Sequence, residues 1–141
     1  MKKIIFYNDT GFPYAVLAAA IRSGELPAHR APQLCELGHV LARSGLGRGD
    51  ATVYNLGRGE QGESCLALWS PGNGDMVGRA VNSFLDLMHI DNYELVYIKC
   101  RGTLSAKAGV WLAKIPGLKG VGLSLVHRHI VSIYRELGAG L

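Results

Sequence analysis

The sequence predicts an α/β fold: a three-layer, Rossmann-like arrangement in which a mostly parallel sheet of about five strands carries helices on both faces. Short apolar runs alternate with longer stretches of helical periodicity. Glycine and small polar residues separate these stretches, as they do in strand-to-helix loops. Hydrophobic residues make up 48% of the 141-residue chain and charged residues only 18%, a composition that a sheet covered on both faces buries well. We expect a single domain spanning residues 1–141.

The first unit is a strand, a loop and a helix. We expect the strand at Lys3–Tyr7, a polar loop at Asn8–Phe12 and a helix from Pro13 to Ser23. Proline fits the first turn of a helix, and Gly24 is a natural C-terminal stop. This helix is apolar almost all round, which indicates burial against the sheet rather than a surface position.

A second helix and a hairpin follow. Apolar residues recur on one stripe from Pro32 to Arg43, which predicts a helix. Two short apolar runs, Thr52–Leu56 and Cys65–Trp69, flank a loop rich in glycine and are expected to pair as a β-hairpin. The hairpin supplies the one antiparallel strand of the sheet.

The second half of the chain continues the alternation. Apolar residues from Met76 to Met88 mark one helical face, and Asp75 is a good N-cap for that helix. The remaining expected elements are a strand at Glu94–Lys99, a helix from Leu104 to Ile115 that must stop at Pro116, a strand at Val121–Val126 and a helix at Ile130–Leu137.

Four loops are expected to open on the same edge of this sheet, because each follows a strand and leads into a helix. They are Asn8–Phe12, Ser70–Asp75, Cys100–Thr103 and His127–His129. Helix N-termini favour anions, glycines let a ligand approach the backbone, and arginine suits bidentate phosphate contacts. The predicted ligand-binding residues are therefore Asn8, Asp9, Thr10, Gly11, Gly72, Asn73, Gly74, Asp75, Arg101, Thr103 and Arg128.

No nucleotide-binding motif supports this placement. The chain has no GxxxxGK[ST] pattern, and no GxGxxG follows the first strand. The four loops also fit ordinary strand-to-helix turns. We therefore predict no cofactor, and the sequence leaves open whether the protein is an enzyme.

Histidine and cysteine near the predicted edge are weaker candidates. His127 and His129 stand two apart at the end of an expected strand, so both would project from one face. A zinc site needs at least three protein ligands, and no third is specified, so no metal site is predicted. Cys100 precedes an expected helix N-terminus, but Ala106 stands where a phosphatase-like spacing needs arginine. A buried inert thiol is the favoured interpretation.

Cysteine content and hydropathy indicate a cytoplasmic protein. Cys35, Cys65 and Cys100 are far apart and form no CxxC pair, which favours reduced thiols. The apolar run at the start is too short for a signal peptide, and no stretch has the length and apolar character of a membrane span.

Basic residues concentrate in residues 95–135. The net charge is +4, and no acidic residue lies between Glu94 and Glu136. Such a segment suggests an anionic partner, or a solvated face balanced by acids elsewhere. Nucleic acid is the less favoured partner, because Tyr97, Trp111 and Tyr134 fall on positions patterned for burial and leave no stacking platform.

The opening stretch, IIFYNDTGFPYAVLAAAIRSGELP, resembles a bacterial family catalogued as domain-of-unknown-function 3189. The family has a first loop of the type Gly-Gly-Thr-His-Ser-Ser, an Ala-Ala-Ala-Ile helix and a Leu-Pro exit. The matching residues are Gly11, Ala18, Ala19, Ala20, Ile21, Leu26 and Pro27, and the Gly72-Asn73-Gly74 turn is similar to a family Gly-x-Gly turn. Where the family has Thr-His-Ser-Ser, this chain has Phe12 to Ala15. The resemblance therefore implies the fold and a divergent, uncharacterised member.

Three functions follow as hypotheses. The first is binding of a small anionic or phosphate-bearing ligand at the carboxyl edge of the sheet. The second is a non-catalytic interaction module that forms homo-oligomers or binds a protein, with Phe12, Tyr14 and Trp69 exposed together. The third is nucleic-acid binding through residues 95–135.

Overall fold

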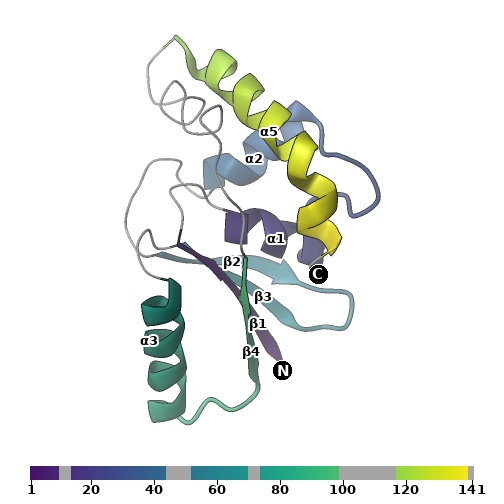
Figure 1. Ribbon diagram of the computed structural model, residues 1–141. Coiled ribbons are helices and arrows are strands. Elements are labelled where there is room, and N and C mark those ends of the chain that lie inside the picture. The colour runs from purple at the N-terminus through teal and green to yellow at the C-terminus, as the bar shows by residue number, and fades with distance from the viewer. Residues whose placement is uncertain (10–13, 44–51, 70–73, 99–116, 140–141) are drawn as a thin grey trace.

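The computed structural model describes residues 1–9, 14–43, 52–69, 74–98 and 117–139, and a four-stranded sheet organises them (Figure 1). The strands are β1 (Lys3–Asn8), β2 (Thr52–Arg58), β3 (Ser64–Trp69) and β4 (Tyr93–Tyr97). Their order is β2-β3-β1-β4, with β1 parallel to both of its neighbours and β2 antiparallel to β3. The predicted α/β class and the antiparallel hairpin strand are thus confirmed.

Helices cover both faces of the sheet, as predicted. The helices are α1 (Tyr14–Ser23), α2 (Leu34–Arg43), α3 (Gly74–Leu87) and α5 (Lys119–Ala139). One face packs on α1, and the other packs on α3. The arrangement is consistent with a Rossmann-like fold.

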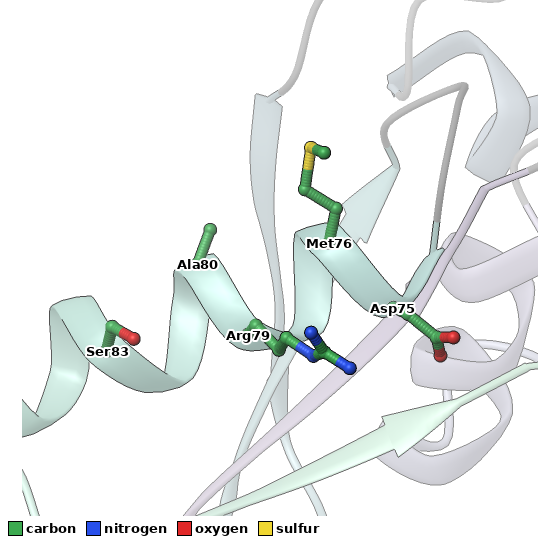
Figure 2. A pocket seen from close by; sticks show the side chains of 5 residues that line it. All are labelled: Asp75, Met76, Arg79, Ala80 and Ser83. Atoms are coloured by element: carbon green, nitrogen blue, oxygen red, sulfur yellow. The ribbon is translucent and has the colours of Figure 1, made fainter.

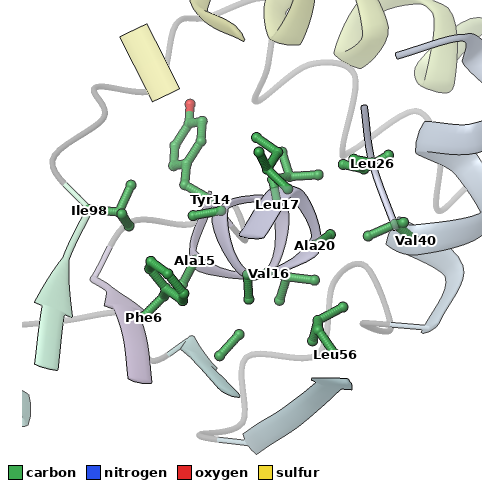
Figure 3. Packing of buried hydrophobic residues seen from close by; sticks show 14 of the residues in the cluster. Phe6, Tyr14, Ala15, Val16, Leu17, Ala20, Leu26, Val40, Leu56 and Ile98 are labelled. Carbon is green, nitrogen blue, oxygen red and sulfur yellow. The ribbon is translucent and has the colours of Figure 1, made fainter. Parts of the chain in front are cut away.

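Helix α1 lies between the sheet on one side and α2 and α5 on the other (Figure 1). Every residue from Tyr14 to Ile21 is buried, which explains why its sequence is apolar on all sides. Around it pack Phe6 of β1, Leu56 of β2 and Val40 of α2 (Figure 3). The alanines of α1 are small enough for the helix to approach both layers closely.

The fifth strand predicted at Val121–Val126 is wrong, because these residues belong to α5. A short apolar run does not by itself distinguish a strand from a buried helical segment. Here the buried positions Gly122, Val126, Ile130 and Tyr134 recur every four residues, which is helical spacing. The described residues therefore contain four strands rather than five, and His127–His129 lies within a helix rather than in a loop at a strand end.

Smaller differences concern the ends of elements. Compared with the predictions, β1 extends one residue further, to Asn8, and β2 extends to Arg58. The strand expected at Glu94–Lys99 begins earlier, at Tyr93, and ends earlier, at Tyr97. The helix expected from Leu104 to Ile115 lies outside the described residues. Among those that are described, no helix has the length and apolar character needed to cross a membrane.

Candidate functional site

The carboxyl ends of β1, β3 and β4 lie at one edge of the sheet, because the three strands are parallel. The centre of this edge is Asp9, which directly follows β1. Its Oδ2 accepts a hydrogen bond from the backbone N–H of Gly74, the first residue of α3, at 2.9 Å. Its Oδ1 accepts one from the hydroxyl of Tyr97, the last residue of β4, at 2.8 Å. One carboxylate therefore joins three elements that are far apart in the sequence.

Gly74 makes this junction possible. A Cβ at that position would stand 2.9 Å from both Asp9 Oδ2 and the ring of Tyr97. Any side chain there would push the carboxylate away from the helix N-terminus. The predicted site residue Gly74 is thus required for close packing against Asp9.

Two stacked tyrosines lie next to Asp9, and one of them donates a hydrogen bond to it. Tyr7 and Tyr97 are register partners on β1 and β4, and their rings stack with centroids 5.1 Å apart. The hydrogen bond to Asp9 and burial raise the pKa of Tyr97 to about 12. Its hydroxyl therefore stays protonated at neutral pH and serves as a hydrogen-bond donor.

Asn8 has a structural position. It is fully buried, and its Oδ1 accepts a hydrogen bond of 3.0 Å from the N–H of Ala15 in the first turn of α1. This bond fixes the start of α1 relative to the end of β1, as an N-cap does. Asp75, by contrast, is exposed in the first turn of α3, where the helix dipole favours a negative charge.

Arg79 is a candidate site residue that sequence reasoning missed. It lies one turn beyond Asp75, and its guanidinium is directed toward the amino-terminal end of α3 (Figure 2). A shallow depression of about 340 Å³ lies beside it, lined by Tyr7, Asp75, Gly78, Arg79, Asn82 and Leu95. The sequence pattern that could have identified Arg79 is an arginine in the first turns of a helix that begins at the predicted edge of the sheet.

His127 and His129 contact different parts of the chain. His127 donates a hydrogen bond from Nε2 to the carbonyl oxygen of Pro32 at 2.8 Å. His129 is buried, with Nε2 2.7 Å from the hydroxyl of Tyr14 in α1. Residues two apart on a helix point in different directions, so the prediction that both project from one face is wrong. The described part of the chain contains no cluster of three or more metal-ligating side chains.

Burial lowers the pKa of His129, which makes stability depend on pH. In the unfolded chain His129 takes up its proton near its ordinary pKa of about 6.5, before it does so in the folded protein. We therefore expect stability to be fully present above that pH and to decline as the pH falls toward the lowered folded-state pKa, by at most about 1.4 kcal/mol per pH unit. Urea unfolding between pH 7.5 and 5 measures the slope. His129→Gln should flatten it.

The remaining predicted site residues divide into two groups. Arg128 is exposed on α5 and does not lie in a strand-end loop. Thr10, Gly11, Gly72, Asn73, Arg101 and Thr103, and also Cys100, lie outside the described residues.

Nucleic-acid binding stays a prediction. Arg128 and Arg135 are exposed and stand seven positions apart on α5, which places them on one helical face. Most other basic residues of the segment 95–135 lie outside the part that the structure describes. Binding that weakens steeply with salt would support this hypothesis.

The fold and this edge define an α/β protein with a candidate ligand site at the carboxyl ends of its parallel strands. The chain belongs to the family described as "Protein of unknown function (DUF3189)", whose model matches residues 3–139. The family resemblance predicted from the opening stretch is thereby confirmed. No curated protein and no solved structure shows a significant match to this chain.

Proposed function

We propose that this protein binds a small ligand with an anionic group, such as a phosphate, at the carboxyl edge of its sheet. The supporting observation is the junction at Asp9, where the end of β1, the start of α3 and the end of β4 meet. Asp9, Gly74 and Tyr97, which lie at the ends of three elements far apart in the sequence, are thus in direct contact. Ligands of α/β proteins commonly bind at such a convergence.

The charges at the edge indicate where the anion would lie. The N–H of Gly74 already donates to Asp9, so the anion is not expected on that amide. Arg79 borders the depression next to the junction and offers a guanidinium to a phosphate. Asp75 lies on the same rim and opposes an anion through charge repulsion.

This arrangement predicts opposite effects for two substitutions. We expect millimolar inorganic phosphate, nucleotides or sugar phosphates to raise the melting temperature of the protein, because such ligands bind only the folded state. Arg79→Gln should remove most of the shift by removing the cation. Asp75→Asn should increase the shift by removing repulsion. Thermal denaturation with each probe at constant ionic strength measures both.

Arg58→Gln is the matched control, because Arg58 is exposed on β2, away from the depression. Its shift should equal that of the unmodified protein. No shift with any phosphate-bearing probe, or an equal shift in Arg79→Gln, would contradict the proposal.

The second candidate function is self-association through α3. Met76, Phe84 and Leu87 are 69%, 60% and 76% exposed and share one side of that helix. Val53 on β2 is also exposed, and it faces the same side of the sheet because its register partner Leu68 packs in the core under α3. Large apolar side chains exposed on one face in this way are typical of interfaces between protein chains.

The oligomeric form of this hypothesis predicts a homodimer that Phe84→Glu converts to a monomer, since a buried unpaired carboxylate is costly. Light scattering over a range of protein concentrations measures the mass. Arg135→Glu, a charge change at an exposed position of α5, is the control. A monomer at all concentrations would reject self-association. The surface expected from Phe12, Tyr14 and Trp69 does not form as predicted, because Tyr14 is fully buried.

We further propose a cytoplasmic location in a bacterium. Cys35 and Cys65 are both free thiols, which suits a reducing compartment. The bacterial source follows from the family resemblance alone.

A further inference from the structure

A second cavity lies at the opposite, amino-terminal end of the sheet. It has a volume of about 150 Å³ and lies between the first residues of β1 and β4 and the last turn of α1. Its apolar wall consists of Ile4 and Phe6 of β1 and Val96 of β4. Its lining residues Ile4, Phe6 and Val96 face the α1 side of the sheet, whereas Tyr7, which lines the depression near Asp9, faces the α3 side.

The cavity contains an arginine that a buried carboxylate holds in place. Arg22 Nε donates a hydrogen bond of 2.7 Å to Oε1 of Glu63, in the loop of the β2–β3 hairpin. The side chain of Glu63 is only 4% exposed. Its other oxygen, Oε2, accepts a hydrogen bond from the backbone N–H of Gln61 at 3.0 Å. Both oxygens of the carboxylate are thus engaged.

The hairpin loop is shaped around this carboxylate. A Cβ on Gly59 would overlap the carboxyl group of Glu63, so only glycine leaves room for it. The backbone N–H of Gly59 donates to the carbonyl oxygen of Glu63 at 2.8 Å, which closes the loop. Hydrogen bonding from its own backbone amide and from Arg22 holds the pKa of Glu63 below its ordinary value, so the group is ionised at neutral pH.

This arrangement leaves the outer part of the Arg22 guanidinium available. Within the described residues, the hydrogen bonds and ion pairs of Arg22 use only Nε, so Nη1 and Nη2 have no partner there. Two guanidinium nitrogens side by side match the two oxygens of a carboxylate. A fixed guanidinium also loses less side-chain entropy on binding than a freely rotating one.

The other charged groups at the cavity, Lys2 and Glu94, balance each other in charge. Lys2 lies at the cavity and forms an ion pair of 2.8 Å with Glu94, and both side chains are half exposed. The two carboxylates at the cavity are therefore both paired with cations. Hydrogen-bond donors on Arg22 and Lys2 remain in excess.

We propose that this cavity binds a small aliphatic carboxylate, with its oxygens on Nη1 and Nη2 of Arg22 and its alkyl group against Ile4, Phe6 and Val96. The volume of about 150 Å³ equals the share of roughly five water molecules at ~30 Å³ each, which suits an anion the size of propionate. The apolar wall favours an organic anion over an inorganic one. This site is independent of the function proposed for the opposite edge.

A titration followed by NMR tests the proposal. We expect sodium propionate, at constant ionic strength, to produce saturable shifts of the Arg22 Nε–Hε signal and of the backbone amides of Gln61 and Val96. The dissociation constant should be on the order of 1 mM, since a ligand with so few atoms gains limited binding energy. Propionamide, which has the same shape and no charge, should produce no saturable shift. Inorganic phosphate should bind at least tenfold more weakly.

Two variants probe the two halves of the site. Arg22→Lys keeps the charge but removes the paired nitrogens, and should weaken propionate binding at least tenfold. Val96→Met fills the cavity while leaving the Arg22–Glu63 pair in place, and should abolish binding. Arg58→Lys, on the exposed surface of β2, is the control and should bind propionate as the unmodified protein does.

Several results would overturn the proposal. These are no saturable shift with propionate, equal affinity for phosphate, or unchanged affinity in Val96→Met. If Arg22→Lys fails to fold, Val96→Met still decides, because Val96 is only partly buried and its strand is at the edge of the sheet that the described residues form. Arg79→Gln should leave propionate binding unchanged, which separates this site from the proposed phosphate site.

Discussion

Replacing Asp9 by alanine is expected to lower the free energy of unfolding by about 3–6 kcal/mol, because two hydrogen bonds to a charged group are lost, each of about 1.5–3 kcal/mol. The carboxylate joins the N–H of Gly74 to the hydroxyl of Tyr97, so its removal disconnects α3 and β4 from the end of β1. Urea unfolding measures the loss in stability. The pKa of Tyr97, about 12 in the unmodified protein, should fall toward its ordinary value in the variant.

The tyrosine titration separates a local effect from general destabilisation. Alkaline titration followed by tyrosinate absorbance or NMR reports directly on the hydroxyl that Asp9 accepts from. Asp9→Asn keeps one carbonyl oxygen as an acceptor and should lie between the unmodified protein and Asp9→Ala in stability. A Tyr97 pKa that stays near 12 in Asp9→Ala would show that Asp9 is not its cause.

The second large effect is expected at Tyr14, the first residue of α1. Tyr14→Ala should lower the free energy of unfolding by about 3–5 kcal/mol, because it leaves a cavity where a fully buried ring packs. Tyr14→Phe keeps the ring and removes only the hydroxyl next to His129, and should cost about 0.5–1.5 kcal/mol. The difference between the two variants measures packing separately from hydrogen bonding.

Phe84→Ala is the matched control for this pair. Phe84 is an aromatic residue on a helix like Tyr14 but is mostly exposed, so its substitution should change stability by no more than about 0.5 kcal/mol. Equal losses in Tyr14→Phe and Tyr14→Ala would contradict the assignment of the larger share to packing. A loss below 1 kcal/mol in Tyr14→Ala would contradict the buried position of α1 itself.

Asn8, Asp9 and Tyr14 connect the end of β1 and the start of α1 to neighbouring elements. Asn8 binds the N–H of Ala15, and Asp9 binds the N–H of Gly74, so consecutive residues fix the N-termini of two helices on opposite faces of the sheet. Tyr14 then ties the start of α1 to His129 of α5. Asn8 and Asp9, two of the predicted ligand-binding residues, thus also make hydrogen bonds that anchor helices.

Some contacts could not be predicted from the sequence, because they join residues that no local pattern connects. Tyr97 is 88 positions from Asp9, and its pattern indicated only burial. Glu63 follows Arg22 by 41 positions. The sequence around Glu63 indicates only a hairpin loop and gives no sign of its contact with Arg22. The error at Val121–Val126 has a different cause: alternating apolar residues there fit both periods, and packing of α5 on α1 and α2 decides for the helix.

The sequence alone determined the α/β class, most strands and helices, the antiparallel hairpin and the family, because these depend on local periodicity, turn residues and motif identity. It also indicated that β1 ends close to Asn8, and so where the carboxyl edge of the sheet lies. Only the tertiary structure decided which side chains meet at that edge, that α5 is one helix, and that Arg22 is held by Glu63 beside a second cavity. These features depend on strand order and on distances between elements, which are properties of the packed chain and not of any segment within it.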